Sequence, residues 1–266
     1  CIIRYGVFIM PSTYAHYKFA HEVITLLPDG AQRAVKENIT LYLTGCHGPD
    51  ILFYYKAIKS NDVNKLGYGM HSQPAAPFFE RAKGLVKEGG APYLAYTMGF
   101  ITHFALDSTC HGYVESERKK LGITHTKLEV EFDRSLLCAD GKTPVSQKLA
   151  GHISPDERCA EVIAPFFSLT PEEIKRSLKD MKRICNLFVC PGRIKRGIVK
   201  GVLKMVSAEL PDQVMGVEPD PVCDESNKKM LELFDSAKAV VGQLALNFAE
   251  NINSNELSER FNADYE

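Results

Sequence analysis

Apolar residues recur at every third or fourth position along most of this chain, which is the periodicity of amphipathic helices. Stretches with this pattern span residues 13–27, 31–45, 77–88 and 126–136, and a last one runs from about 226 to 251. We find no sustained alternation of apolar and polar residues, which is the pattern of strands, and no internal repeat. The sequence therefore predicts an all-α fold, in which many helices pack as one bundle-like domain.

Helix starts can be read at several later positions. Residues 154–157 and 170–173 each combine an N-cap residue, a proline at N1 and a glutamate at N3, so both predict a capping box. Residues 211–221 are acidic and rich in proline, which predicts an irregular connection. Residues 193–207 are basic and amphipathic. We interpret them as a solvated helix that packs by its aliphatic side, with contact to a membrane surface or a phosphate as the alternative.

The stretch from Tyr93 to Cys110 is apolar on nearly every face, which predicts a buried helix. His103, Asp107 and His111 follow one another at intervals of four residues, so they lie along one face of this helix. Buried charges are paired or coordinate a metal, and imidazole and carboxylate are ligands for transition metals. The alternative is a hydrogen-bonded His–Asp pair with an unrelated third histidine.

His125 and Glu129 repeat the same four-residue spacing shortly afterwards. The chain has only 8 histidines, and three of them fall between residues 103 and 125. This clustering favours a metal site over an isolated buried pair.

Two histidines lie on the first predicted helix, five residues apart, which is poor helical phase for a shared face. His16 lies between two tyrosines on the apolar side and is the candidate ligand. His21 is next to Glu22 and is interpreted as a surface or cap residue.

A turn after the second predicted helix supplies another candidate. Gly45, Gly48 and Pro49 force this turn, which places Asp50 on a rigid corner. His47 is its rival, and we expect His47 to hydrogen-bond within the turn.

Two further histidines lie in predicted loops. His71 follows a glycine-rich stretch before a helix and is a candidate ligand, whereas His152 is expected to support the site from outside or to lie at the surface. The full candidate set is His16, Asp50, His71, His103, Asp107, His111, His125 and Glu129. These nitrogen and oxygen donors suit hydrolytic zinc, and eight are too many for one ion but fit two or three. Clustered metal ions are typical of phosphoryl transfer.

Composition narrows the function classes. The formal net charge of −1 argues weakly against a nucleic-acid binder, which neutralises phosphates with basic side chains. The 8 cysteines form no CxxC motif, so we expect buried free thiols and neither a disulfide scaffold nor a zinc ribbon.

The amino-terminal stretch CIIRYGVFIM lacks the features of a signal peptide. No uncharged apolar run reaches the length of about eighteen residues that a membrane span needs. A cytoplasmic location is therefore expected. Met10 makes a natural start, so residues 1–9 are interpreted as an extension and residues 10–266 as a single domain. Its metal-site half is 10–135, and its helical C-terminal half is 155–266.

The stretches YAHYKFAHEV, GCHGPDILFYY, GMHSQP, THFALDSTCH and HTKLE together resemble the bacterial zinc-dependent phospholipase C family, whose fold relatives include P1-type single-strand nucleases. The resemblance covers residues 10–135. It implies one zinc held by Asp50, His71, His103 and Asp107, a second held by His111, His125 and Glu129, and a third held by His16 and a bridging Asp107. In that family the third zinc also takes the chain's amino terminus, at a tryptophan. This chain has no tryptophan, and neither Cys1 nor Pro11 matches that pattern.

The resemblance implies a zinc-dependent hydrolase that cleaves a phospholipid or related phosphodiester with a zinc-activated hydroxide. Asp50 would be the catalytic residue that accepts a proton from the attacking water. Phe53, Tyr54 and Tyr55 would line a head-group pocket, where a quaternary ammonium can make cation–π contacts. The expected partners are a phospholipid or small phosphodiester and a transient membrane surface, with no stable nucleic-acid partner.

The sequence leaves two alternatives open. A single-strand nuclease or phosphomonoesterase could use the same metal scaffold, although the nuclease branch favours Asp where this chain has Glu129. A non-catalytic binding protein would keep the ligands but lack an open position on the metal.

Overall fold

Helices make up the regular structure of this protein. The computed structural model describes residues 12–254 and 256–265, and no strand occurs within these ranges. The α-helices are α1 (Thr13–Val23), α2 (Asp29–Glu37), α3 (Ile39–Gly45), α4 (Asp62–His71), α5 (Ala76–Gly89), α6 (Ala91–Leu121), α7 (His125–Ala139), α8 (Glu157–Phe167), α9 (Pro171–Phe188), α10 (Arg193–Val206) and α11 (Asp224–Glu250). Short 3-10 helices are η1 (Ile24–Leu26), η2 (Gly48–Tyr54), η3 (Pro144–Ser146), η4 (Leu210–Gln213), η5 (Pro221–Cys223) and η6 (Glu259–Asn262). The predicted all-α fold is confirmed.

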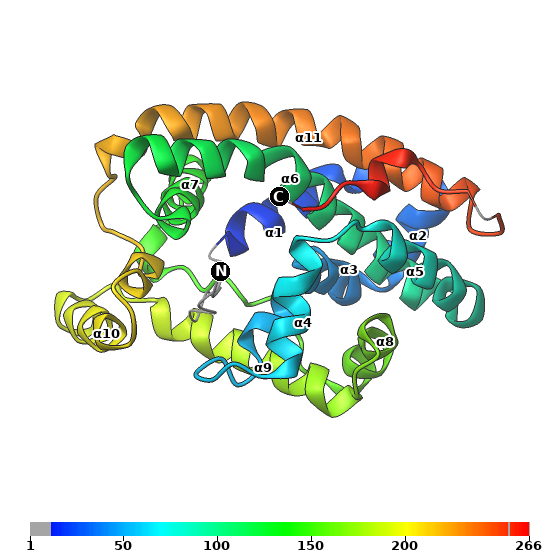
Figure 1. The fold of residues 1–266 in the computed structure, drawn as a ribbon, viewed down its shortest axis with the longest axis horizontal. Coiled ribbons are helices and arrows are strands. Elements are labelled where there is room, and N and C mark those ends of the chain that lie inside the picture. The colour runs from blue at the N-terminus through cyan, green and yellow to red at the C-terminus, as the bar shows by residue number, and fades with distance from the viewer. Residues whose placement is uncertain (1–11, 255, 266) are drawn as a thin grey trace.

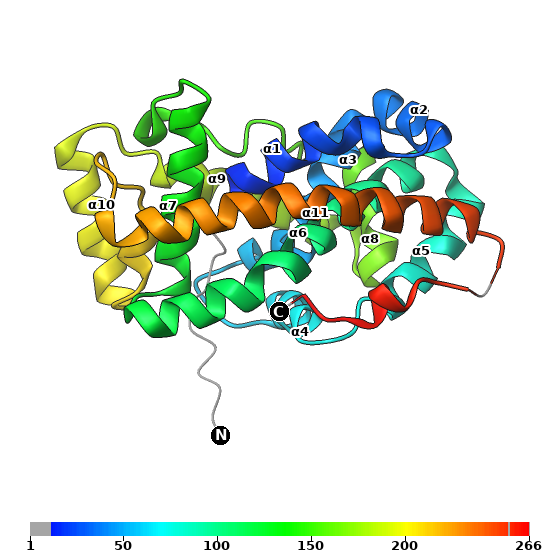
Figure 2. The ribbon, with the colours of Figure 1, turned by 90° about the horizontal axis from the view of Figure 1, so that it is seen from above.

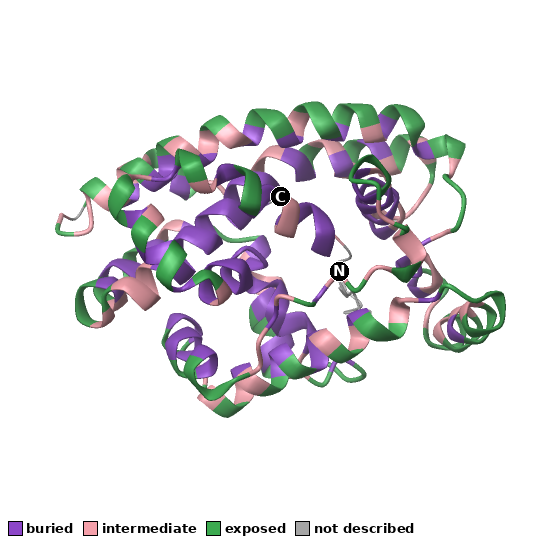
Figure 3. Ribbon diagram, turned by 180° about the vertical axis from the view of Figure 1, so that it is seen from behind, coloured by how far each residue is buried: buried purple, intermediate pink, exposed green. Residues whose placement is uncertain are grey.

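Helix α6 is the centre of the packing. Every residue from Ala95 to Asp107 is buried, as expected for a helix that is apolar on all sides. Helix α11 runs along α6 for much of its length, and α1, α2, α3 and α5 also pack against α6 (Figures 1 and 2). α11 turns one face towards α6 and the other towards solvent (Figure 3). The side chains on α6 therefore meet elements from both halves of the chain.

Helices α3 and α6 cross at two glycines. A Cβ atom at Gly99 would lie 2.1 Å from the carbonyl oxygen of Tyr42 and 2.9 Å from the Cα of Gly45. Only residues without a side chain allow two backbones to approach this closely. The crossing places the end of α3, and the η2 turn that follows it, beside the next turn of α6, which carries His103.

Asp133 on α7 anchors the start of α1. Its carboxylate accepts hydrogen bonds from the backbone N–H groups of Tyr14 (2.9 Å) and Ala15 (2.8 Å), which have no partner within their own helix. Burial raises the pKa of Asp133 to about 7, although these two hydrogen bonds act in the opposite direction. Since Glu129 lies one turn before Asp133, this contact fixes α1 relative to the predicted ligands on α7.

Several expected element boundaries differ from the structure. The stretch 31–45 forms two helices, α2 and α3, because Asn38 takes a non-helical backbone conformation (φ −132°, ψ 42°) between them. Asp156, and not Ser154, caps α8, since its carboxylate accepts the backbone N–H of Cys159 at 2.8 Å. His71 is the last residue of α4, where a loop was expected.

Other expectations are confirmed. Thr170 and Glu173 form the predicted capping box at the start of α9. Residues 193–206 form the predicted basic helix, α10. No helix in the described ranges has the length and apolar character needed to cross a membrane. The interpretation of residues 1–9 as an extension, with a start at Met10, concerns residues outside the described ranges.

Candidate metal centre

Five elements bring the eight predicted ligands together. One histidine comes from α1, one aspartate from η2 and one histidine from the end of α4. Helix α6 contributes three ligands and α7 contributes two. All eight fall into groups whose donor atoms lie within 4.8 Å of one another: His16 with Asp50 and His103, His71 with His103 and Asp107, and His111 with His125 and Glu129.

Asp107 lies at the centre of the cluster. Its Oδ2 atom is 3.0 Å from Nε2 of His103 and 3.9 Å from Nε2 of His71. Its Oδ1 atom is 3.2 Å from Nε2 of His16 and 3.8 Å from Nε2 of His111. A carboxylate whose two oxygens face different imidazoles is placed to bridge two metal ions. The four-residue spacing on α6 directs both neighbouring histidines to the same carboxylate.

Asp50 lies beside two of the histidines that face Asp107. Its Oδ1 atom lies 2.9 Å from Nε2 of His71 and 4.0 Å from Nε2 of His103. The Nδ1 atom of His71 is 3.0 Å from the carbonyl oxygen of Gly67, to which it donates when the proton is on Nδ1. That hydrogen bond leaves the Nε2 lone pair free for a metal, which is the usual arrangement for a ligating histidine.

The group of His111, His125 and Glu129 has a similar arrangement. Nε2 of His125 is 3.1 Å from Oε1 of Glu129, and Nε2 of His111 is 3.7 Å from the same atom. On its other side, Nδ1 of His125 is 3.1 Å from the carboxylate of Glu115. Sequence reasoning missed Glu115, although it follows His111 by four residues and so continues the same spacing on α6. A carboxylate behind a histidine fixes the ring and raises its basicity.

Several donor atoms in the cluster have no hydrogen-bond partner among the described residues. They are Oδ1 of Asp50, Nε2 of His71, Nε2 of His103, Oδ2 of Asp107 and Nε2 of His125. Burying such atoms without a partner is costly, and native structures rarely do so. The atoms approach one another closely but without the geometry of hydrogen bonds. This favours metal ligation over a buried His–Asp pair, and the donor types suit zinc in a hydrolytic site.

Comparison with known families agrees with this geometry. Residues 15–179, more than half of the chain, match the family described as zinc dependent phospholipase C. The chain belongs to this family. Comparisons with curated proteins and with solved structures give no match. Family membership indicates zinc as the metal and hydrolysis as the chemistry, and the matched segment contains all eight predicted ligands.

The electrostatics of the centre favour the protonation states that bind zinc. Burial lowers the pKa of His103 to about 4, even though Asp107 lies beside it. Burial raises the pKa of Glu129, but His125 and His111 outweigh this and bring it to about 2. The histidines around Asp107 likewise hold its pKa below the usual range despite burial. At neutral pH the centre therefore offers a neutral imidazole at His103 and two ionised carboxylates.

The pKa values of three ligand histidines shift in the opposite direction. Burial acts to lower the pKa of His71, but the carboxylate of Asp50 outweighs it and raises this pKa above its usual value. Burial acts to lower the pKa values of His16 and His125, but the carboxylates of Asp107 and Glu129 outweigh it and raise both to about 9. Without metal, the imidazoles of His16 and His125 each carry a proton at neutral pH. Zinc must displace these protons, because only the neutral imidazole is a ligand.

Gly48 makes room for one ligand. Its backbone has φ +49°, and a Cβ atom there would lie 2.0 Å from Cδ2 of the His103 ring. We therefore expect Gly48→Ala to displace this imidazole and weaken zinc binding by about 10- to 100-fold. Competition against a zinc-binding dye measures the change. Gly84→Ala is the matched control, since nothing lies within 4 Å of its added Cβ. Equal affinities of the two variants would contradict this role of Gly48.

The histidines left outside the ligand set have other environments. Nε2 of His47 lies 2.7 Å from Nε2 of His152, and the two rings stack. The backbone of His47 hydrogen-bonds within its turn, as expected, since its N–H donates to the carbonyl of Thr44 and its carbonyl accepts from the N–H of Asp50. Its side chain instead faces His152, which is half-buried. His21 is exposed, as expected.

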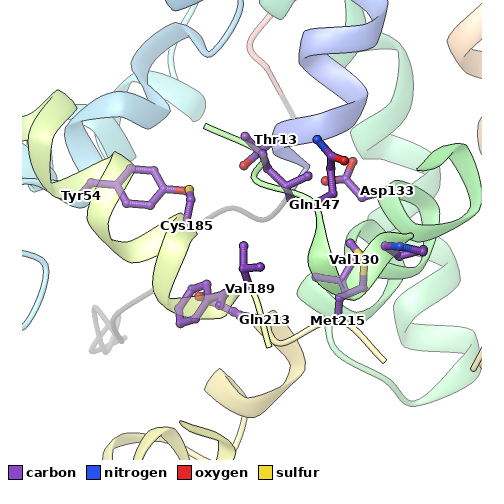
Figure 4. Close-up of a pocket in the computed structure, with 12 residues that line it drawn as sticks. Thr13, Tyr54, Val130, Asp133, Gln147, Cys185, Val189, Gln213 and Met215 are labelled. Carbon is purple, nitrogen blue, oxygen red and sulfur yellow. The ribbon is translucent and has the colours of Figure 1, made fainter. Parts of the chain in front are cut away.

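The three aromatic residues that were expected to line a head-group pocket lie in different environments. Phe53 is buried, stacks on Tyr68 and has its ring centre 5.2 Å from that of His71. Tyr54 turns instead into a separate pocket, which Thr13, Asp133 and Cys185 also line (Figure 4). The half-exposed Tyr55 has the ammonium group of Lys56 4.9 Å from its ring centre. Only Phe53 among the three has a ring contact with a predicted ligand among the described residues.

Tyr265, near the end of the chain, also reaches the centre. Its ring centre is 5.4 Å from that of His71 and 5.8 Å from that of His103, and its backbone N–H donates to the carbonyl of His71. The ring is fully buried, and its hydroxyl has no hydrogen-bond partner in the described part of the chain. No motif in the sequence marks this residue. The C-terminal half thus contributes an aromatic side chain that packs against two of the predicted ligands, all of which come from the first half.

Proposed function

We propose that this protein is a zinc-dependent phosphodiester hydrolase of the phospholipase C type, acting on a phospholipid or a related small phosphodiester. The observation that supports it most is the bridging position of Asp107 among four imidazoles. A structural zinc site needs four ligands and favours cysteine, whereas the three groups that contain the predicted ligands supply eight donors and no thiolate. Several metal ions held close together serve phosphoryl transfer.

The proposed ligands fall into two complete groups and one partial group. Asp50, His71, His103 and Asp107 would hold one zinc, and His111, His125 and Glu129 would hold a second. His16 and Asp107 would contribute to a third. The distance of 3.2 Å between Nε2 of His16 and Oδ1 of Asp107 supports that position. Any donor from Cys1 or Pro11 would come from outside the described residues.

Zinc would supply a Lewis acid and, near neutral pH, a hydroxide nucleophile. The chain's own residues would position the reactants. Asp50 has a buried oxygen without a hydrogen-bond partner in the described ranges, so it can accept a proton from the attacking water. The carbonyl of Gly67 and the carboxylate of Glu115 hold the rings of His71 and His125 in their orientations.

The exposure of the ligands supports one approach route for the substrate. The His125 side chain is 19% exposed, whereas the side chains of the other seven ligands are 8% exposed or less. Tyr265 covers the side of His71 and His103. A phosphodiester would therefore reach the centre past His125.

The direct test offers zinc-loaded protein three substrates: phosphatidylcholine vesicles, the soluble diester p-nitrophenylphosphorylcholine, and single-stranded DNA. We expect hydrolysis of the two choline diesters, with diacylglycerol and phosphocholine released from the vesicles. Cleavage of DNA alone would replace the proposal with the nuclease alternative. Full zinc content with no hydrolysis of any of the three substrates would contradict the proposal and support the alternative of a metal-stabilised binding protein.

A further inference from the structure

Helix α10 carries a stripe of large apolar side chains on its solvent face. Ile194 is 82% exposed, Ile198 is 63% exposed and Met205 is 80% exposed. At roughly 100° per residue these three side chains fall within one narrow face, and the half-exposed Val202 lies at its margin. The helix is held to the protein through a different face, by Val199 and Leu203. The exposed stripe is therefore separate from the face by which α10 packs on the rest of the protein.

α10 is placed where this stripe is accessible. The helix lies at one end of the long axis of the molecule in both ribbon views (Figures 1 and 2). Most of its residues are exposed (Figure 3). Val199 is the one residue of the helix that is buried. Exposing large aliphatic side chains to water is unfavourable, and contiguous exposed apolar surface often marks a site of interaction. The stripe is therefore a candidate contact surface.

The same helix carries basic side chains that form no ion pair with the carboxylates of the described residues. Its basic residues are Arg193, Lys195, Arg196, Lys200 and Lys204, and it contains no acidic residue. None of the five forms an ion pair with a carboxylate in residues 12–254 and 256–265. Lys195 and Arg196 bond to the carbonyls of Val189 and Cys190, which orients them but leaves their charge. By helical phase, Lys195 and Lys204 lie on opposite flanks of the apolar stripe.

We propose that α10 docks the protein on the surface of a bilayer that contains anionic phospholipid. Such a surface offers an apolar layer for the stripe and negative head groups for the flanking cations. Long basic side chains at the flanks can extend to the head groups while their stems cover apolar surface. The helix is too polar to span the bilayer and would lie in the plane of the interface.

A second copy of this chain fits the surface poorly. Pairing two α10 helices by their stripes would bring ten cations together, since each helix carries five and no acid. Like charges that face one another destabilise an interface. The anionic bilayer is therefore the occupant that satisfies both the charge and the apolar stripe. This docking is independent of the proposed hydrolysis and is tested without it.

The test is co-sedimentation of the whole protein with vesicles, in low salt and in high salt. One set contains phosphatidylcholine alone, and the other contains phosphatidylcholine mixed with phosphatidylglycerol. We expect binding to the anionic vesicles that weakens with salt, and weaker binding to phosphatidylcholine alone. The double variant Ile194→Asp, Ile198→Asp should bind anionic vesicles at least about tenfold less tightly. Leu246→Asp, on the solvent face of α11 and 49% exposed, is the matched control and should bind as the parent does.

A second variant separates charge from apolar contact. Arg193→Glu with Lys204→Glu should remove the preference for phosphatidylglycerol. Hydrolysis of p-nitrophenylphosphorylcholine should be unchanged in all these variants, so a failure of docking and a failure of the proposed activity give different results. Absence of sedimentation by the parent protein, or equal sedimentation of parent and double variant, would overturn the proposal. So would a change in oligomeric state of the double variant without vesicles, since it would assign the stripe to a protein interface.

Discussion

Asp107→Ala is expected to abolish hydrolysis and to lower zinc content. The carboxylate faces four imidazoles through its two oxygens, so its loss removes a shared ligand and leaves the histidines facing one another. Loss of a residue that merely orients a ligand costs about 10- to 100-fold in metal affinity or activity. Loss of a bridging ligand should cost more than this. Zinc per chain and the rate on p-nitrophenylphosphorylcholine measure the two effects.

The controls for this prediction separate ligation from folding. His103→Ala should have the same effect, because its Nε2 lies 3.0 Å from Oδ2 of Asp107. His21→Ala removes an exposed histidine from α1 and should leave zinc content and rate unchanged. Circular dichroism shows whether each variant keeps its helices. A folded Asp107→Ala protein with full zinc content and full activity would show that Asp107 is not a ligand.

Removal of zinc is expected to lower the melting temperature substantially. Without metal, the cluster keeps buried carboxylates and imidazoles whose donor atoms lack hydrogen-bond partners within the described residues. Zinc at about a thousand times its Kd stabilises the folded state by about 4 kcal/mol per site. At roughly 2–4 °C per kcal/mol for a chain of this size, each site should contribute roughly 8–16 °C. Scanning calorimetry with and without a chelator measures the shift.

Addition of zinc should restore the original melting temperature, and magnesium should not, because imidazole-rich sites favour zinc. The Asp107→Ala variant is the matched control and should show a much smaller response to the chelator. A melting temperature that does not change on complete removal of zinc would mean that the His and carboxylate side chains are satisfied without metal.

The part of the site that lies on one helix could be predicted from sequence because helical geometry is local. His103, Asp107 and His111 share a face of α6 whatever the rest of the chain does, and the same holds for His125 and Glu129 on α7. The buried character of α6 was also predictable, since its apolar residues cover every face. The structure adds that both groups of ligands converge on one cluster.

Other features depend on contacts between distant segments. Asp50 meets His103 because α3 and α6 cross at Gly45 and Gly99, which no local pattern reveals. Tyr265 reaches His71 from the far end of the chain and carries no motif. The break between α2 and α3 was missed because the helical pattern of apolar residues continues through Asn38, whose backbone is not helical.

The central claim, a centre with several zinc ions, is tested most directly by metal stoichiometry. The protein should be purified without chelator or metal-affinity tag and its metal content measured by elemental mass spectrometry. We predict two or three zinc ions per chain, three being the result if His16 and Asp107 hold one of their own. No bound metal, even after zinc is added back, would contradict the account, because the eight residues would then be satisfied by one another.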